Sequence, residues 1–297
     1  MRDFTERNLT DSVLWQLEKT PDERLKQIMT SLITHLHAFV REVELTEEEW
    51  FQGIKFLTDT GHLCDDLRQE FILLSDTLGV SMLVDAINHR APAGATESTV
   101  LGPFYRDGAP EMQVGASIAD GTPGEPTFVS GRVIGLDGTP IAGALLDVWQ
   151  ASPTGLYESQ DPAQRAFNLR GKFRSDAEGR YAFRTVKPAS YPIPLDGPVG
   201  RMMTALAREA YRPAHIHFVI SANGYETLTT HVFVAGDPHL DSDPVFVVKS
   251  SLVVEFVRRD SPEEAKARGT TAPFYTVEDN FVLKPRRRRC IGPRRSR

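Results

Sequence analysis

The sequence has little cysteine and no long hydrophobic run. Its 297 residues include only two cysteines, Cys64 and Cys290, so neither a disulfide framework nor a cysteine-based zinc site is expected. The N-terminus lacks the apolar core of a signal peptide, and no segment approaches the length of a membrane-spanning helix. A phosphate-binding glycine loop, a nucleophile elbow and internal repeats are also missing. These absences favour a soluble protein of the reducing cytoplasm.

Positive charge is concentrated at the C-terminus. The formal net charge is −6, but residues 284–297 hold eight cationic side chains, and without them the charge would be −14. An acidic body is poorly suited to nucleic acid, so we expect no nucleic-acid partner. We interpret residues 284–297 as a disordered, solvated tail. An arm that binds nucleic acid or an anionic membrane is the alternative.

Two periodicities divide the chain. Over residues 5–90 apolar side chains recur at helical spacing, and Thr20-Pro21 and the Thr46–Glu49 box predict helix N-termini. After the linker Ala91–Ala95, short apolar runs separated by Gly, Asp and Asn turns predict strands. The expected strands cover residues 128–136, 144–149, 172–174, 181–184, 215–220, 227–234, 245–257 and 274–283.

This order of elements predicts an α+β fold with segregated parts. We expect a helical domain over residues 1–98, followed by an antiparallel β-sandwich over residues 99–283 and the Arg-rich tail.

One expected strand carries two histidines at positions i and i+2, His215 and His217. Alternate strand residues share a face, so both imidazoles can converge on one metal ion from backbones about 7 Å apart. His35 and His37 have the same spacing in a helical pattern, where the rings point apart. We therefore expect His215 and His217, but not His35 and His37, to bind a metal ion. Satisfied polar or surface histidines are the alternative.

Two tyrosines, Tyr157 and Tyr191, are candidates to complete such a site. Tyr157 follows the turn Pro153–Leu156, and Tyr191 lies in the proline-rich segment 187–198, which restricts its direction. Taken singly, each tyrosine fits a packing role better. Tyrosine binds metal as phenolate and needs a strongly Lewis-acidic ion. Ferric iron fits that need, whereas magnesium and calcium do not accept two imidazoles.

Several segments, in the same order, resemble the intradiol ring-cleaving dioxygenases. They are Val129–Ile134, Gly143–Ser152, Gly155–Tyr157, Arg174–Asp176, Gly179–Phe183, Tyr191–Gly200, Arg212–His217 and Gly236–Pro238. The resemblance covers roughly residues 10 to 280. It implies helices on a β-sandwich and a non-haem Fe(III) held by Tyr157, Tyr191, His215 and His217.

The resemblance also implies catalytic roles and a substrate pocket. Tyr191 would leave the metal and accept a substrate proton, and Arg212 would stabilise the anionic substrate. A structural salt bridge is the alternative role of Arg212. The implied pocket is lined by Leu73, Asp76, Val100, Gly102, Pro103, Phe104, Ile193, Pro194, His231 and Val245.

Two of these residues bear on the substrate. Asp76 shares a helix face with Leu73, and a carboxylate facing an aromatic pocket is costly unless the ligand supplies a hydrogen bond. A third ring hydroxyl would supply one; otherwise Asp76 points to solvent or caps a turn. His231 stands where catechol-cleaving members typically have Gln. Together with the segment Asp237–Asp243, both features resemble the hydroxyquinol (benzene-1,2,4-triol) branch of the family. That resemblance implies cleavage of hydroxyquinol by O2 to 3-hydroxy-cis,cis-muconate and maleylacetate, with catechol or chlorocatechol as the alternative.

The resemblance further implies partners. It implies a homodimer through the N-terminal helices and a tunnel between them that a lipid can occupy. Outside the family, a non-catalytic β-sandwich binding module is the alternative, with the histidines and tyrosines serving packing or sugar stacking.

Overall fold

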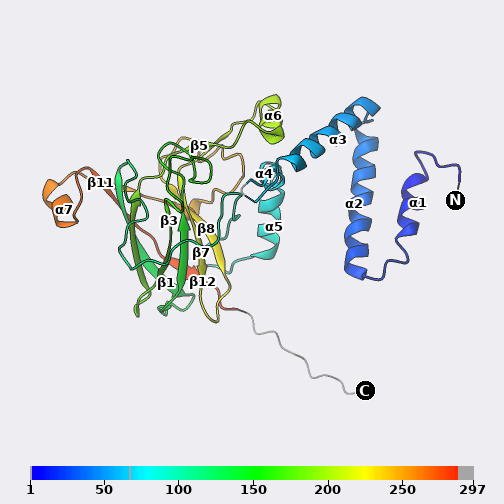
Figure 1. Cartoon of the computed structure of the whole chain (residues 1–297). Coiled ribbons are helices and arrows are strands. Elements are labelled where there is room, and N and C mark those ends of the chain that lie inside the picture. The colour runs from blue at the N-terminus through cyan, green and yellow to red at the C-terminus, as the bar shows by residue number, and fades with distance from the viewer. Residues whose placement is uncertain (1, 67, 287–297) are drawn as a thin grey trace, which may run out of the picture. The chain divides into compact units, whose positions relative to one another are not determined.

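The computed structural model describes residues 2–66 and 68–286 (Figure 1). The chain divides into two compact units between Asp59 and Thr60, within helix α3 (Glu47–His62). The division predicted at residues 98 and 99 follows secondary structure and stays a prediction. No described helix is both long and apolar enough to cross a membrane. Residues 287–297 of the predicted tail lie outside the described residues, and so does Cys290.

The first unit contains helices α1 (Leu9–Gln16) and α2 (Glu23–Glu42) and most of α3. Helix α2 begins two residues later than the sequence predicted. The Asp22 carboxylate accepts hydrogen bonds from the amides of Arg24 and Leu25, so Asp22 is the N-cap and the prediction of Thr20 was wrong.

The predicted capping box of α3 is confirmed. The amide of Glu49 donates to the Thr46 hydroxyl, and the amide of Thr46 donates to the Glu49 carboxylate. Both amides at the start of the helix therefore have partners.

The second unit begins with helices α4 (Glu70–Thr77) and α5 (Val80–Asn88) and continues as a β-sandwich. One described sheet has the order β3-β2-β7-β8-β9, and the other has the order β10-β11-β1-β12 with β4 also on β1. The strands of the first sheet are β2 (Leu145–Trp149), β3 (Arg170–Arg174), β7 (His215–Ser221), β8 (Leu228–Val234) and β9 (Val253–Val254). Those of the second are β1 (Pro126–Gly135), β4 (Arg180–Val186), β10 (Val257–Arg259), β11 (Phe274–Glu278) and β12 (Phe281–Leu283).

The predicted fold class, α+β with helices before a β-sandwich, is confirmed. Most described strand pairs are antiparallel, but β1 pairs in parallel with β11 and β12, and β8 pairs in parallel with β9. The smaller elements are β5 (Tyr191–Pro192), β6 (Tyr211–Arg212), α6 (Pro198–Ala205), the 3-10 helix η1 (Ser250–Leu252) and α7 (Pro262–Ala267).

Strand β7 lies in the middle of its sheet and is buried on both faces. Ile216, Phe218 and Ile220 point into the apolar core that joins the two sheets, together with side chains such as Val133 of β1. The alternate positions His215 and His217 face the other way and are also buried. Packing of the apolar face therefore fixes the direction of both imidazoles.

The strand predicted at residues 245–257 was wrong. The Asp243 carboxylate accepts hydrogen bonds from the amides of Val245 and Val247, and Phe246 has a positive φ of 59°. These contacts curl the chain around Asp243, and the short elements η1, β9 and β10 come next in place of one long strand.

Two glycine substitutions test the packing. A Cβ on Gly131 would lie 1.6 Å from the carbonyl oxygen of Asp279, whereas a Cβ on Gly53 in helix α3 meets nothing within 4 Å. We expect Gly131→Ala to destabilise the protein by about 1–3 kcal/mol. The matched Gly53→Ala should stabilise it by about 0.5–1 kcal/mol. Urea denaturation measures both, and an unchanged midpoint for Gly131→Ala would contradict the register of β1 with the Asp279 loop.

Candidate metal centre and active site

The structure brings together the four side chains that the sequence singled out. His215 and His217 come from β7, Tyr191 from β5, and Tyr157 from the loop after β2. Tyr157 Oη lies 2.8 Å from Tyr191 Oη and 3.0 Å from His217 Nε2. His215 Nε2 lies 3.4 Å from Tyr191 Oη and 3.1 Å from His217 Nε2. The four atoms thus form a closed ring, and all four side chains are buried.

The spacing of these atoms fits a single metal ion. Ligand atoms about 2.0–2.1 Å from an ion, at angles near 90–110°, lie roughly 2.8–3.4 Å from one another. His215 Nδ1 lies 2.6 Å from the carbonyl oxygen of Pro213 and donates to it, which leaves the Nε2 lone pair directed at the ring centre. The donor atoms can therefore coordinate one ion without rearrangement of the backbone.

The protonation states of the four buried side chains also suit metal binding. Burial holds the pKa of His215 and of His217 well below the usual value, so both imidazoles are neutral. Burial raises the pKa of Tyr191, and burial with the neighbouring Tyr191 raises the pKa of Tyr157 well above 10. Without a strong Lewis acid both tyrosines are therefore neutral phenols, and a metal ion would displace their protons.

A third histidine, His231 of β8, lies beside the ring. Its imidazole centroid is 4.1 Å from that of His217, and its Nδ1 bonds the hydroxyl of Thr99. The ligand atoms of His215, His217 and His231 lie within 4.8 Å of one another, so a three-histidine site is a second arrangement of donors. The ring with the two tyrosines is tighter, with no edge longer than 3.4 Å.

Aromatic contacts hold two of the four rings. Trp149 stacks on His217 with centroids 4.6 Å apart and an angle of 11°, and Phe104 stacks on Tyr157 at 4.5 Å and 20°. Sequence reasoning missed the role of Trp149. The available signal was its place at the end of a strand that pairs with the His-x-His strand, where it lies opposite His217.

Arg212 faces this ring and is also held by a salt bridge. Its Nη1 lies 3.4 Å from Tyr191 Oη and 3.2 Å from His215 Nε2, and its Nε donates to Asp243 at 3.3 Å. The catalytic and structural roles considered for Arg212 are therefore compatible, because the salt bridge aims the guanidinium at the site. Asp243 as the partner of Arg212 was not predicted.

Nine of the ten predicted pocket residues line one small cavity next to the ring. They are Leu73, Asp76, Val100, Gly102, Pro103, Phe104, Ile193, Pro194 and Val245, and they are joined there by Tyr191, Arg212 and His217. His231 does not line this cavity. Neither does Tyr157, so Tyr191 is the tyrosine that a bound molecule would meet.

Asp76 is buried at this cavity, which rules out the solvent-facing alternative. It is 2% exposed, and its Oδ1 has no hydrogen-bond partner among the described residues. Burial raises the pKa of Asp76, while a hydrogen bond with Ser81 and the charge of Arg212 act against that rise. The carboxyl group is therefore costly unless a ligand supplies a partner.

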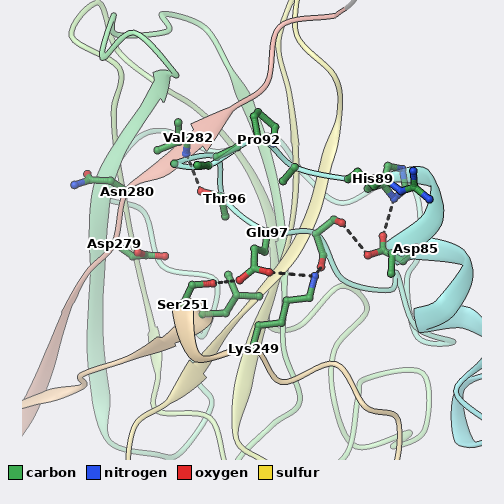
Figure 2. A pocket seen from close by; sticks show the side chains of 18 residues that line it. Asp85, His89, Pro92, Thr96, Glu97, Lys249, Ser251, Asp279, Asn280 and Val282 are labelled. Carbon is green, nitrogen blue, oxygen red and sulfur yellow. Dashed lines mark hydrogen bonds and ion pairs between the residues drawn. The ribbon is translucent and has the colours of Figure 1, made fainter.

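A second cavity, of about 670 Å³, is roomier and lies between the 89–98 segment and β12 (Figure 2). The carboxylate of Asp279 points into it, and burial raises the pKa of that group to about 6. None of the four ring-forming side chains lines it. Size alone therefore does not identify the reactive site.

Comparisons with known proteins agree with this geometry. Residues 100–284 match the family described as "Dioxygenase", and residues 22–96 match "Catechol dioxygenase N terminus". A 6-chlorohydroxyquinol 1,2-dioxygenase from Cupriavidus pinatubonensis is 51% identical over 96% of this chain and 99% of its own. The solved hydroxyquinol 1,2-dioxygenase from Pseudomonas putida is 52% identical, with a TM-score of 0.87 over 95% of this chain and 99% of its own. A solved Acinetobacter catechol 1,2-dioxygenase is 30% identical, with a TM-score of 0.84 over 96% and 94%.

The chain belongs to the intradiol ring-cleavage dioxygenase family, and it is an enzyme of that class. Its similarity is greater to relatives named for hydroxyquinols than to the Acinetobacter catechol enzyme.

The two His-x-His pairs provide a matched test of the metal centre. We expect His215→Ala to lose bound metal because it opens the ring of four donors. His35→Ala, in the pair whose helix turns the rings apart, should leave the metal content unchanged. Elemental analysis of the purified proteins gives the metal-to-protein ratio. Equal ratios in wild type and His215→Ala would contradict the assignment.

Proposed function

We propose that the protein cleaves hydroxyquinol with O2 at an Fe(III) ion held by Tyr157, Tyr191, His215 and His217. The ring bond between the two adjacent hydroxyl-bearing carbons breaks, and both oxygen atoms enter the product. The product is 3-hydroxy-cis,cis-muconate, which tautomerises to maleylacetate. The observation that carries the choice of substrate is the unpartnered, buried Asp76 carboxyl oxygen at the cavity.

The donor set supports ferric iron. Two phenolates and two neutral imidazoles favour a trivalent, strongly Lewis-acidic ion. Fe(III) would supply the Lewis acidity that ionises both phenols and the adjacent hydroxyls of a bound diol. Zinc is a weaker fit because buried phenols with raised pKa values give up their protons less readily to a divalent ion.

The two tyrosines are proposed to act differently. Tyr191 lines the cavity, and Arg212 Nη1 lies 3.4 Å from its hydroxyl oxygen. We assign to Tyr191 Oη the acceptance of one proton from an incoming hydroxyl, since it is the tyrosine within reach of the substrate. The fixed charge of Arg212 then stabilises the anionic substrate.

The cavity walls support a substituted aromatic ring. Leu73, Ile193 and Val245 offer buried apolar surface to the ring. Asp76 is the polar exception on the helix side, and the third hydroxyl of hydroxyquinol would give its Oδ1 a partner. Catechol or chlorocatechol is the second candidate substrate, supported by the same apolar walls but leaving Asp76 without a partner.

Asp76 provides the test of the substrate. A hydrogen bond to a charged group contributes about 1.5–3 kcal/mol, so Asp76→Ala should lower kcat/KM for hydroxyquinol relative to catechol by about ten- to a hundredfold. Asp76→Asn keeps an acceptor oxygen and should retain part of the preference. Oxygen uptake with each diol measures the ratio. If both substrates lose activity in equal proportion, Asp76 is structural and the choice of hydroxyquinol fails.

We also propose a homodimer through the N-terminal helices, with a lipid bound between them. Helix α2 has no buried residue, and it leaves Leu25, Ile28, Leu32, Leu36 and Phe39 between 46% and 51% exposed. Such a continuous apolar stripe favours association.

Native mass spectrometry reads the dimer and any retained lipid in one spectrum. The wild-type chain should be dimeric at micromolar concentration, and Leu32→Glu with Leu36→Glu should yield monomer because charges replace the centre of the stripe. A monomeric wild-type protein would refute the dimer.

A further inference from the structure

A buried guanidinium without full partners lies next to Tyr157. Arg170 of β3 is 2% exposed, and its Cζ lies 5.8 Å from the centroid of the Tyr157 ring. Its Nε donates to the Glu158 carboxylate at 2.7 Å, but Nη1 and Nη2 have no partner among the described residues. Burying a cation whose N–H donors lack partners costs folding free energy, so the burial of Arg170 suggests a function.

Arg170 shares its hydrogen-bonded carboxylate with a second arginine, and the charge of the buried Asp147, which is paired with Lys172 at 3.4 Å, also acts on it. Glu158 also accepts a hydrogen bond at 2.7 Å from Arg106, whose side chain is 33% exposed. Two guanidinium groups thus share one carboxylate, and the cluster of Arg106, Glu158 and Arg170 carries a net charge of +1. The face of the Tyr157 ring offers this cluster a cation–π contact.

Each tyrosine of the site has an arginine beside it that is held at Nε by a buried carboxylate, although the charge of Arg212 also acts on Tyr157. Arg212 is held by Asp243 and reaches the Tyr191 hydroxyl, where a proton can be exchanged. Arg170 is held by Glu158 and lies against the ring of Tyr157, away from the cavity lining.

We propose that Arg170 is a positioning residue: held by Glu158, its guanidinium lies against the ring of Tyr157 and orients that tyrosine as a metal ligand. The inference rests on the proposed function, because it needs Tyr157 to bind Fe(III). Strand pairing fixes the geometry, since Arg170 lies opposite Trp149, the residue that stacks on His217. The preformed charge would thus retain the metal and set the energy of the tyrosinate-to-iron charge transfer.

Because Arg170 and Glu158 carry opposite charges, we expect their neutral variants to shift the visible band in opposite directions. Removing the positive charge in Arg170→Met raises the energy of the phenolate electrons, so the visible charge-transfer band should move to longer wavelength. Removing the negative charge in Glu158→Gln leaves both arginines uncompensated, so the band should move to shorter wavelength. Arg170→Lys keeps the charge and should stay near the wild-type band. A purely structural pair would move both bands in the same direction or neither.

Iron retention gives a second readout that does not depend on turnover. Release of iron to a chelator should be about ten- to a hundredfold faster in Arg170→Met than in wild type, and near wild type in Arg170→Lys. If Arg170→Met does not fold, the shift of Glu158→Gln and the behaviour of Arg170→Lys decide the question.

The outcomes separate the two proposals. A wild-type protein with iron but no charge-transfer band would overturn the tyrosine ligands and this inference together. A normal wild-type band with unshifted bands in Arg170→Met and Glu158→Gln would overturn the role of Arg170 alone.

Discussion

The second unit depends on four buried ligand atoms, each of which lies within 3.4 Å of two others. Burying two phenols and two imidazoles costs free energy unless each has a partner, and here each is the partner of another. The backbone brings them together from β5, β7 and the loop after β2. Because β7 must direct its apolar positions into the core, the two histidines have one orientation available.

Charge around this ring is arranged asymmetrically. Arg212 approaches from the cavity side and contacts Tyr191, while Arg170 lies against Tyr157 on the side of β3. Each arginine is oriented by a buried carboxylate and keeps at least one Nη group without a partner among the described residues. An enzyme that must bind anions in a dry site gains from such fixed cations, because no solvent reorganisation is needed when negative charge develops. Among the described residues that line the cavity, Asp76 is the only acidic one, and its Oδ1 has no hydrogen-bond partner there.

Much of this arrangement was predictable from the sequence, for definite physical reasons. A period of two in residues 215–220 fixed the shared face of His215 and His217, and the Thr46–Glu49 box located a helix start from side-chain chemistry alone. The cavity lining followed from resemblance to the family. The parallel pairing of β1 with β11 and β12 did not, because alternation along a strand carries no information about the direction of its neighbours. The curl after Asp243 comes from local hydrogen bonds of Val245 and Val247, which the apolar pattern of residues 245–257 does not reveal. The partners of Arg170 depend on the packing of separate segments, which local patterns do not encode.

The central claim is that Tyr157, Tyr191, His215 and His217 hold one iron ion. Anomalous X-ray diffraction recorded on both sides of the iron absorption edge tests it most directly. We predict a single peak, present above the iron edge and absent below it, within about 2.0–2.3 Å of Tyr157 Oη, Tyr191 Oη, His215 Nε2 and His217 Nε2. A peak coordinated instead by His215, His217 and His231, or one that appears only above the edge of another metal, would contradict the account.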